Sequence, residues 1–251
     1  VKWDLGVNFS LNRSKVLVLS EDKDIFGGEL DNTILKDQLN LMRVGEPMYV
    51  FYGYVEDGYD ENGHIVYKNM DDDPAITAAD KTIIGDPNPD FLVNLTTAVS
   101  YKGFTLSAFF QSSIGNDIYS LSMAAQAYDY GYNGNTLREV YYNHWTPENP
   151  TAKYPNLDQT SYKMSDRFVY DGSFVRLKKL ELAYDVPCAR NKFIKRARVY
   201  VSAQNLFTIT SYPFWDPDIN ANGGGSSMIQ GVDSYCYPSA RTYTIGCRLT
   251  F

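Results

Sequence analysis

The chain has 251 residues and a formal net charge of −7, because 30 Asp and Glu residues outnumber 23 Lys and Arg residues. This acidic balance argues against nucleic acid as a partner. The sequence contains no run of about eighteen apolar residues, which excludes a membrane-spanning helix but not a membrane-spanning β-barrel, whose signal is alternation. Cys188, Cys236 and Cys247 are odd in number and widely spaced, so they indicate neither a disulfide framework nor a metal motif.

Three segments of alternating polarity lie in the first half of the chain. Successive side chains of a strand point to opposite faces, so alternation of apolar and polar residues predicts a strand. Residues 1–11 carry an apolar side chain at every odd position, from Val1 to Leu11. The pattern recurs over residues 91–101 and 104–113, and Lys102 and Gly103 between them predict a tight turn.

Three further segments of this kind lie in the second half. Residues 173–186 alternate with one slip at Lys178 and Lys179, which predicts a β-bulge, and Pro187 ends the segment. The fifth segment covers residues 196–207. The sixth covers residues 241–251, about the length of a tilted strand that crosses a bilayer. One of its faces is apolar and the other is small or polar: Tyr243, Ile245, Cys247, Leu249 and Phe251 stand against Thr242, Thr244, Gly246, Arg248 and Thr250.

The polar faces of these strands carry the side chains that a hydrated lumen requires, namely Lys2, Asp4, Asn8, Gln111, Arg198, Gln204 and Arg248. The apolar faces then meet lipid in place of a protein core. Backbone groups in lipid must all be paired, so such strands require a closed barrel. Six strands are too few, since about eight is the minimum. We therefore predict an all-β fold in which the chain supplies about six antiparallel strands of a larger transmembrane β-barrel.

The connections between the predicted strands are alternately long and short. The short ones are residues 102–103 and 187–195, and the long ones are residues 12–90, 114–172 and 208–240. Outer-membrane barrels have short periplasmic turns and long extracellular loops. The long connections are therefore expected to be extracellular, and the last strand is expected to end at Phe251 on the periplasmic side.

An ordered series of short motifs runs through nearly the whole chain. They are Gly53-Tyr54 with Asp57-Gly58, IIGDPNPDF at 83–91, YKGF at 101–104, WTPENPT at 145–151, DGSFVRLKKL at 171–180, NLFTI at 205–209, DPD at 216–218, and Tyr237-Pro238 before the closing strand. With this series the chain resembles the C-terminal part of SusC-like TonB-dependent outer-membrane transporters. No single motif is specific, but the ordered series is.

The resemblance implies a barrel of about twenty-two strands with a plug domain in its lumen. It also implies active, TonB-energised import of a nutrient (a glycan, an oligosaccharide or a peptide) across the outer membrane of a Gram-negative bacterium. The expected partners are a SusD-like surface lipoprotein and, through the part of a longer precursor that precedes this chain, TonB. The aromatic residues of the terminal strand, Tyr243 and Phe251, are expected to act as the outer-membrane assembly signal. No cofactor is required.

One acidic segment in the first long connection has the spacing of a calcium-binding loop. Oxygen-bearing side chains stand at its positions 1, 3, 5 and 12, which are Asn69, Asp71, Asp73 and Asp80. The segment departs from the usual pattern, because Pro74 replaces the glycine of the sharp turn and Asp80 is shorter than a bidentate Glu. Two readings stay open, a Ca²⁺ site at residues 69–80 and a solvated acidic loop without an ion.

Tyrosine is abundant, with 21 residues, and aromatic side chains gather in the two later long connections. Aromatic faces stack on sugar rings or on peptide side chains. The alternative is that these rings pack the connections over the end of the barrel. Residues 117–127 and 136–145 are also candidates for short helices. The candidate ligand-binding residues are Tyr128, Tyr130, Tyr132, Tyr141, Tyr142, Trp145 and Trp215.

Catalytic patterns are weak, and we expect no enzyme activity. The two histidines, His64 and His144, lie in different connections, and no nucleophile or zinc motif accompanies them. Two other functions remain as alternatives. A soluble or surface-attached carbohydrate-binding module would expose its polar strand faces to water, and a passive porin would need neither plug nor TonB.

Overall fold

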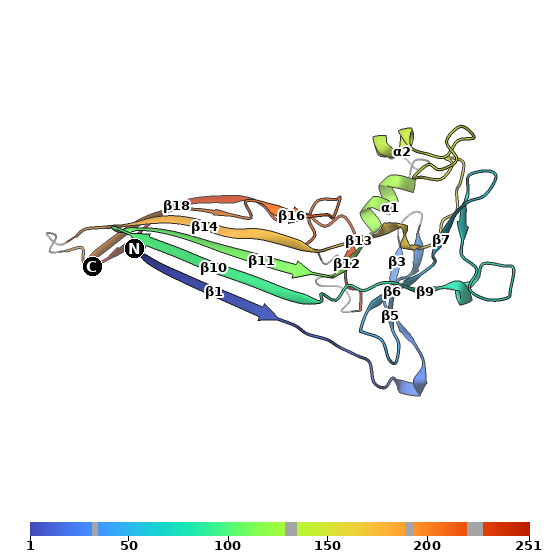
Figure 1. Ribbon diagram of the computed structural model, residues 1–251, viewed down its shortest axis with the longest axis horizontal. Coiled ribbons are helices and arrows are strands. Elements are labelled where there is room, and N and C mark those ends of the chain that lie inside the picture. Colours follow the sequence, from blue (N-terminus) through green and yellow to red (C-terminus); the bar gives the residue numbers. More distant parts are fainter. Residues whose placement is uncertain (32–34, 129–134, 189–192, 220–227) are drawn as a thin grey trace.

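The computed structural model describes residues 1–31, 35–128, 135–188, 193–219 and 228–251. Within these ranges the chain has two parts (Figure 1). Long strands run side by side from the end where both termini lie, and shorter elements gather at the opposite end. None of the described helices is long and apolar enough to span a membrane.

The first part, here called the long sheet, consists of antiparallel strands. In spatial order they are β1 (Lys2–Ser10), β10 (Phe91–Tyr101), β11 (Phe104–Ile114), β14 (Phe174–Val186), β15 (Arg196–Gln204) and β18 (Thr242–Thr250). These strands coincide, within a few residues, with the six alternating segments of the sequence. The fifth is shorter than expected: β15 ends at Gln204, Asn205 has a positive φ of 52°, and β16 (Thr208–Thr210) then pairs with β14 beyond the end of β15.

The slip in the alternation of residues 173–186 is a β-bulge. Phe109 of β11 faces Lys179 of β14 while Phe110 faces Leu177, so Lys178 is the extra residue. A bulge lets the strand keep apolar side chains on one face before and after the slip. The expected tight turn between β10 and β11 also has a clear cause. Lys102 and Gly103 both have positive φ values, 47° and 87°, as two-residue hairpin turns require.

The apolar face of the long sheet is open, whereas a water-soluble sheet covers such a face with other parts of the protein. In β1 the side chains of Trp3, Leu5, Val7 and Phe9 are 66%, 56%, 64% and 61% exposed. In β18, Ile245 is 86% exposed. No other described element covers this apolar face. It is larger than the small apolar patches that soluble proteins usually expose.

The second part, here called the loop assembly, comprises the described residues of 12–90, 115–173 and 211–240. It is folded rather than open. Its sheets are β2 (Ile25–Phe26), β5 (Asn40–Met42), β6 (Val50–Gly53) and β9 (Thr82–Gly85) in that order, β3 (Glu29–Asp31) with β4 (Lys36–Gln38), β7 (Glu56–Tyr59) with β8 (Ile65–Tyr67), and β13 (Val169–Asp171), β12 (Asp117–Ser120) and β17 (Val232–Asp233) in that order.

The described helices are short and all belong to the loop assembly. They are α1 (Leu121–Tyr128), α2 (Arg138–Tyr142) and the 3-10 turns η1 (Ser20–Asp22), η2 (Ala78–Asp80) and η3 (Asp166–Phe168). The expected helix over residues 117–127 was wrong in its first four residues. They form β12, because this segment pairs with β13 on one side and, in parallel, with β17 on the other.

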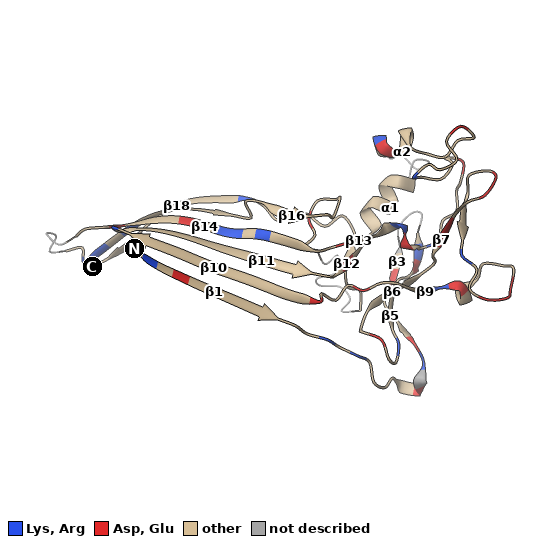
Figure 2. Cartoon of the chain, in the orientation of Figure 1, with Lys and Arg blue, Asp and Glu red and all other residues tan. Residues whose placement is uncertain are grey.

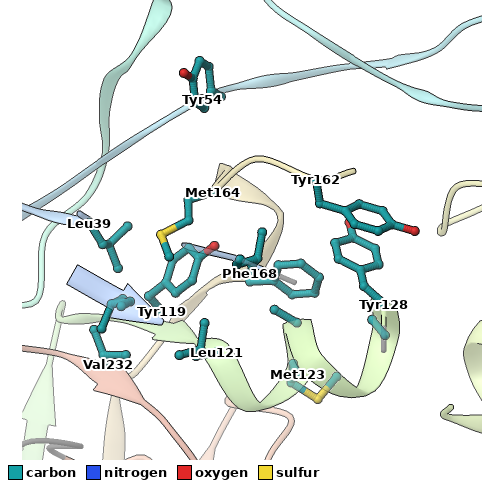
Figure 3. Packing of buried hydrophobic residues seen from close by; sticks show 14 of the residues in the cluster. Leu39, Tyr54, Tyr119, Leu121, Met123, Tyr128, Tyr162, Met164, Phe168 and Val232 are labelled. Carbon is teal, nitrogen blue, oxygen red and sulfur yellow. The ribbon is translucent and has the colours of Figure 1, made fainter. Parts of the chain in front are cut away.

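The hydrophobic core of the protein lies in the loop assembly (Figure 3). Phe51, Tyr119 and Val232 are each 0% exposed, although they come from three different long connections. Figure 3 shows α1 lying against this core, with the Phe168 ring turned toward Tyr128 at the end of the helix. Most Asp and Glu residues also lie in this part (Figure 2). The three connections therefore pack as one unit that closes one end of the long sheet.

Candidate ligand-contacting site at the loop end

The aromatic residues predicted to bind a ligand occupy very different environments. Tyr128, at the end of α1, is only 3% exposed. Its ring stacks on Tyr162 with centroids 3.8 Å apart and meets Phe168 edge-on at 5.1 Å. Both neighbours belong to the core shown in Figure 3, so the Tyr128 ring packs inside the protein in this structure, and its role as a ligand contact stays a prediction. Tyr130 and Tyr132 lie outside the described residues.

Trp145 also packs against the protein. Its indole ring covers Gly63, at the turn between β7 and β8, where a β-carbon would collide with the ring. Gly63 has a positive φ of 80°, which glycine adopts without strain. The neighbouring α2 carries Tyr141 and Tyr142, which are 60% and 70% exposed and touch each other edge-on at 5.2 Å. These two rings, unlike Trp145, are open on the surface.

Trp215 belongs to the last long connection and is 57% exposed. One face of its indole stacks on Phe214, with ring centroids 4.8 Å apart and planes 17° apart. Phe214 in turn packs against the hydrophobic core. Trp215 therefore has one face exposed and the other packed on Phe214, which is itself supported by the core.

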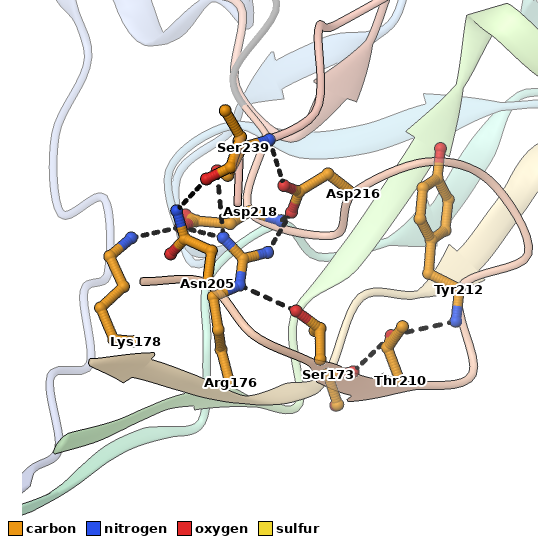
Figure 4. A network of polar contacts seen from close by, with 11 residues as sticks. Ser173, Arg176, Lys178, Asn205, Thr210, Tyr212, Asp216, Asp218 and Ser239 are labelled. Carbon is orange, nitrogen blue, oxygen red and sulfur yellow. Dashed lines mark hydrogen bonds and ion pairs between the residues drawn. The ribbon is translucent and has the colours of Figure 1, made fainter. Parts of the chain in front are cut away.

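A buried arginine holds the segment next to Trp215 (Figure 4). Arg176 of β14 is only 1% exposed and donates to the Thr208 hydroxyl at 2.9 Å and to the Ser239 hydroxyl at 3.1 Å. It also forms an ion pair with Asp216, which is 6% exposed, and a longer contact of 3.4 Å with Asp218. One guanidinium thus joins a strand of the long sheet to both ends of the last connection.

Asp216 is suited to remain ionised in this environment. Burial alone would raise the pKa of its carboxyl group. The backbone N–H groups of Ser239 and Asp218 donate to it at 2.9 Å each, and the Arg176 guanidinium adds a positive charge. These donors outweigh burial and hold the pKa of Asp216 below its ordinary value.

A second buried polar cluster holds the other side of the same connection. The Tyr212 hydroxyl donates to Asp233 of β17 at 2.6 Å and lies 2.8 Å from the Ser120 hydroxyl, and Ser122 donates to Asp233 at 3.1 Å. Burial first, and then the hydrogen bond to Asp233, raise the pKa of Tyr212. The phenol stays protonated and keeps its role as the donor.

A polar cavity of about 290 Å³ lies where the three connections meet. Burial raises the pKa of the Asp117 carboxyl in its wall. The carboxyl accepts a hydrogen bond from the Asp86 amide at 2.8 Å, and the negative charge of Asp86 adds to the rise. The polar side chains of this wall are Tyr49, Asn88, Asn116, Asp117 and Gln230.

The four predicted calcium ligands do not converge. The carboxylate of Asp80 is 0% exposed and accepts the amides of Met70 and Thr77 at 2.7 Å each, and these two donors lower its pKa. Asn69 accepts the Asp71 amide and Asp71 accepts the Asp73 amide, as in successive Asx turns. Across the described ranges, no group of three His, Cys, Asp or Glu side chains is placed to hold a metal ion. The side chains stabilise the backbone of the loop.

Sequence reasoning missed Arg176, Asp216, Tyr212 and Asp233 as a set that anchors the last connection. Arg176 and Asp216 stand in two of the quoted motifs, at 171–180 and 216–218, which were given no role. No local signal marked them, because Arg176 alternates with Val175 and Leu177 like the other polar residues of its strand, and its burial beside Asp216 depends on a segment far along the chain.

No protein-family profile matches the chain. A TonB-dependent receptor of Formosa agariphila, P3, is 32% identical over an alignment 270 positions long, which covers 99% of this chain and 27% of the receptor. The TonB-dependent receptor SusC of Bacteroides thetaiotaomicron is 28% identical over 99% of this chain and 24% of its own length. The structure of the RagAB peptide transporter superposes with a TM-score of 0.77 at 25% identity over 99% of this chain and 27% of that one.

Over nearly its whole length the chain is therefore similar to TonB-dependent receptors, SusC among them. It spans about a quarter of the length of the relatives that it matches. Its long sheet corresponds to antiparallel barrel strands in the transporter structures. The relatives are receptors and transporters rather than enzymes.

The two residues expected to act as the assembly signal lie at opposite ends of β18, with Tyr243 at the end nearer the loop assembly and Phe251 at the end where both termini lie. Tyr243 lies on β18 opposite Ala203 and is 71% exposed. Phe251 follows the last residue of β18 and is 72% exposed. Both are accessible within this chain.

Proposed function

We propose that the chain forms part of the barrel wall and the extracellular mouth of a nutrient importer in the outer membrane of a Gram-negative bacterium. The observation that carries the proposal is the long sheet, whose apolar face is open while its loop end holds the packed core. Lipid supplies the apolar contacts that a soluble protein would make with itself. The relationship to TonB-dependent receptors over 99% of the chain supports the same function.

Import is proposed to be active. The energy comes through TonB, which contacts a part of the receptor other than this chain, and a SusD-like lipoprotein covers the loop assembly. The relatives named SusC and RagAB support this pairing by similarity. The long connections face the outside and the short turns at 102–103 and 187–195 face the periplasm, as the alternation of connection lengths favours.

The nutrient is proposed to be a glycan, an oligosaccharide or a peptide. Its contacts on this chain are the exposed rings of Tyr141, Tyr142 and Trp215, because an open aromatic face stacks on a sugar ring or an apolar side chain. Tyr130 and Tyr132 stay candidates. Trp145 and Tyr128 are less suitable, because the protein itself covers their rings.

The terminal strand is proposed to carry the assembly signal, formed by Tyr243 and Phe251. Their exposure leaves both rings accessible to a binding partner before the barrel closes. A free strand edge such as that of β18 requires pairing with a further strand, because lipid offers no substitute for missing hydrogen bonds.

The proposal is tested with the full-length receptor in its own bacterium. We expect deletion of the receptor gene to abolish growth on one glycan or peptide source, and loss of TonB to have the same effect although the receptor remains in the membrane. Import that continues without TonB would indicate a porin. Expression of residues 1–251 alone without detergent provides a second check, because a soluble monomer would indicate a carbohydrate-binding module.

A further inference from the structure

The segment from Tyr212 to Asp216 is fixed at both ends and open in the middle. Tyr212 and Asp216 are 4% and 6% exposed, and each is held by the buried polar groups described above. Between them, Phe214 packs against the core and Trp215 presents its outer face. A short segment with two anchors and one exposed ring is well suited to present that ring in a fixed orientation.

The anchor at Asp216 has features that a merely stabilising contact would not need. A packed pair of hydrophobic residues would often give as much stability as a buried ion pair, because desolvation of the charges offsets their attraction. The guanidinium of Arg176 instead distributes its donors over three segments, reaching Thr208 after β15, Asp216 beside Trp215, and Ser239 before β18. Such a planar fork fixes direction as well as distance, which a lysine ammonium cannot do.

We propose that Arg176 is a positioning residue, which acts through Asp216 to fix the Phe214–Trp215 pair as a platform on which a flat apolar face of the nutrient stacks. The face is that of a sugar ring or of a ring or proline side chain in a peptide. The proposal rests on the proposed function in one respect, that the loop assembly meets the nutrient. Rigid aromatic contacts bind with little loss of conformational entropy, so a fixed Trp215 binds more tightly than a mobile one.

The first measurement needs no ligand. The full-length receptor, purified in detergent, carries 5-fluorotryptophan, and the fluorine resonance of Trp215 is identified by its loss in Trp215→Phe. We expect one narrow Trp215 resonance in the wild type. In Arg176→Met and in the milder Asp216→Asn the resonance should broaden or split, whereas Arg176→Lys should be intermediate. The resonance of Trp145, which the β7–β8 turn holds independently, is the internal control. An unchanged Trp215 resonance in both variants would overturn the positioning role.

The second measurement uses two probes, a mixture of neutral malto- and xylo-oligosaccharides and a tryptic digest of casein. One of them should shift the Trp215 resonance of the wild type saturably, and the responding probe identifies the nutrient class. The concentration for half-saturation should rise about tenfold in Arg176→Met, the size expected for one aromatic contact. In a receptor that already carries Trp215→Ala, the further substitution Arg176→Met should not weaken the binding of the probe, as measured by calorimetry. Failure of both probes to shift the wild-type resonance would overturn the platform.

A purely structural role predicts a different outcome. Arg176→Met and Asp216→Asn would then lower the melting temperature or the amount in the membrane and leave the half-saturating concentration unchanged. Failure of the proposed function is separately visible. If growth and import do not depend on TonB while Trp215 still responds to a probe, the import mechanism is wrong and the platform stands. If import is TonB-dependent but insensitive to Trp215→Ala and Arg176→Met, the platform is wrong and the import stands.

Discussion

The long sheet and the loop assembly use the same apolar residue types in opposite ways. Ile245 of β18 is 86% exposed, whereas Phe51 of β6 is 0% exposed and meets Tyr119 edge-on at 6.2 Å. Both are large hydrophobic residues in strands. The difference lies in what contacts these side chains. In the loop assembly the rest of the chain does so, and along the long sheet, according to the proposed function, lipid does so. Exposure of apolar residues therefore indicates a surface that needs another apolar phase.

A substitution in the hydrophobic core should destabilise the loop assembly and leave the stability of the long sheet nearly unchanged. Phe51→Ala leaves a cavity beside Tyr119 and should lower the free energy of local unfolding of the loop assembly by about 3–5 kcal/mol. Hydrogen exchange of the full-length receptor measures this, with faster exchange at the amides of β6, β9 and β12 and little change in β10 and β11. Equal acceleration in both parts would mean that they unfold as one unit. Phe9→Ala, on the exposed apolar face, is the matched control.

A charge on the apolar face should disturb the long sheet more than a charge on the polar face. Leu5→Arg places a guanidinium toward lipid near the middle of β1 and should destabilise the barrel by about 2–4 kcal/mol. Asn8→Arg, on the opposite face of the same strand, should be nearly neutral. Denaturant unfolding of the receptor in lipid vesicles gives both values. Equal tolerance of the two substitutions would reverse or remove the assignment of faces.

Acid should loosen the anchor of the last connection before it affects the sheet. The folded-state pKa of Asp216 lies below its ordinary value, so its stabilisation is complete above about pH 3.9 and is lost as the pH falls through the lower folded-state value. Loss of this charged hydrogen bond should cost about 1.5–3 kcal/mol.

The corresponding measurement is limited proteolysis of residues 211–219 with an acid-active protease between pH 6 and pH 2.5. Cleavage should become faster at the acid end. Asp216→Asn mimics the neutral carboxyl group, so its cleavage should be fast at all these pH values and nearly independent of pH. A wild-type profile as flat as that of the variant would contradict the role of Asp216.

The smallest effect on stability should come from the last residue. Phe251 is 72% exposed within this chain, so its deletion removes little burial and should leave the melting temperature of assembled receptor almost unchanged. If Phe251 and Tyr243 are the assembly signal, the same deletion should strongly reduce the amount of receptor in the outer membrane. Quantitative blotting and heat-modifiability gels measure both quantities. Normal amounts with a lowered melting temperature would make Phe251 a packing residue.

The sequence predicted the long sheet well because its strands obey one local rule. Alternation over nine or more residues survives one bulge, and the slip at Lys178 was itself visible. The loop assembly has no such rule. Its strands are two to four residues long, as in β2 and β6, which is too short for a period to emerge.

The candidate site depended on pairings that no local pattern contains. Tyr128 is buried because Tyr162 and Phe168 fold over it from a later segment, so an abundance of tyrosine could not separate packing rings from exposed ones. The acidic residues of 69–80 had the spacing of metal ligands. Short Asp and Asn side chains also accept hydrogen bonds from nearby amides, and in the structure this competing use applies to Asp71 and Asp80.

The central claim is that the apolar face of the long sheet meets lipid and the polar face meets water. A nitroxide scan of residues 3–9 of β1 in the full-length receptor, reconstituted in lipid vesicles, tests it most directly. The account predicts a period of two: oxygen, which concentrates in lipid, should relax labels at 3, 5, 7 and 9 most strongly, and a water-soluble nickel complex should relax labels at 4 and 8 most strongly. A profile without this alternation, or with the two reagents exchanged, would contradict the account.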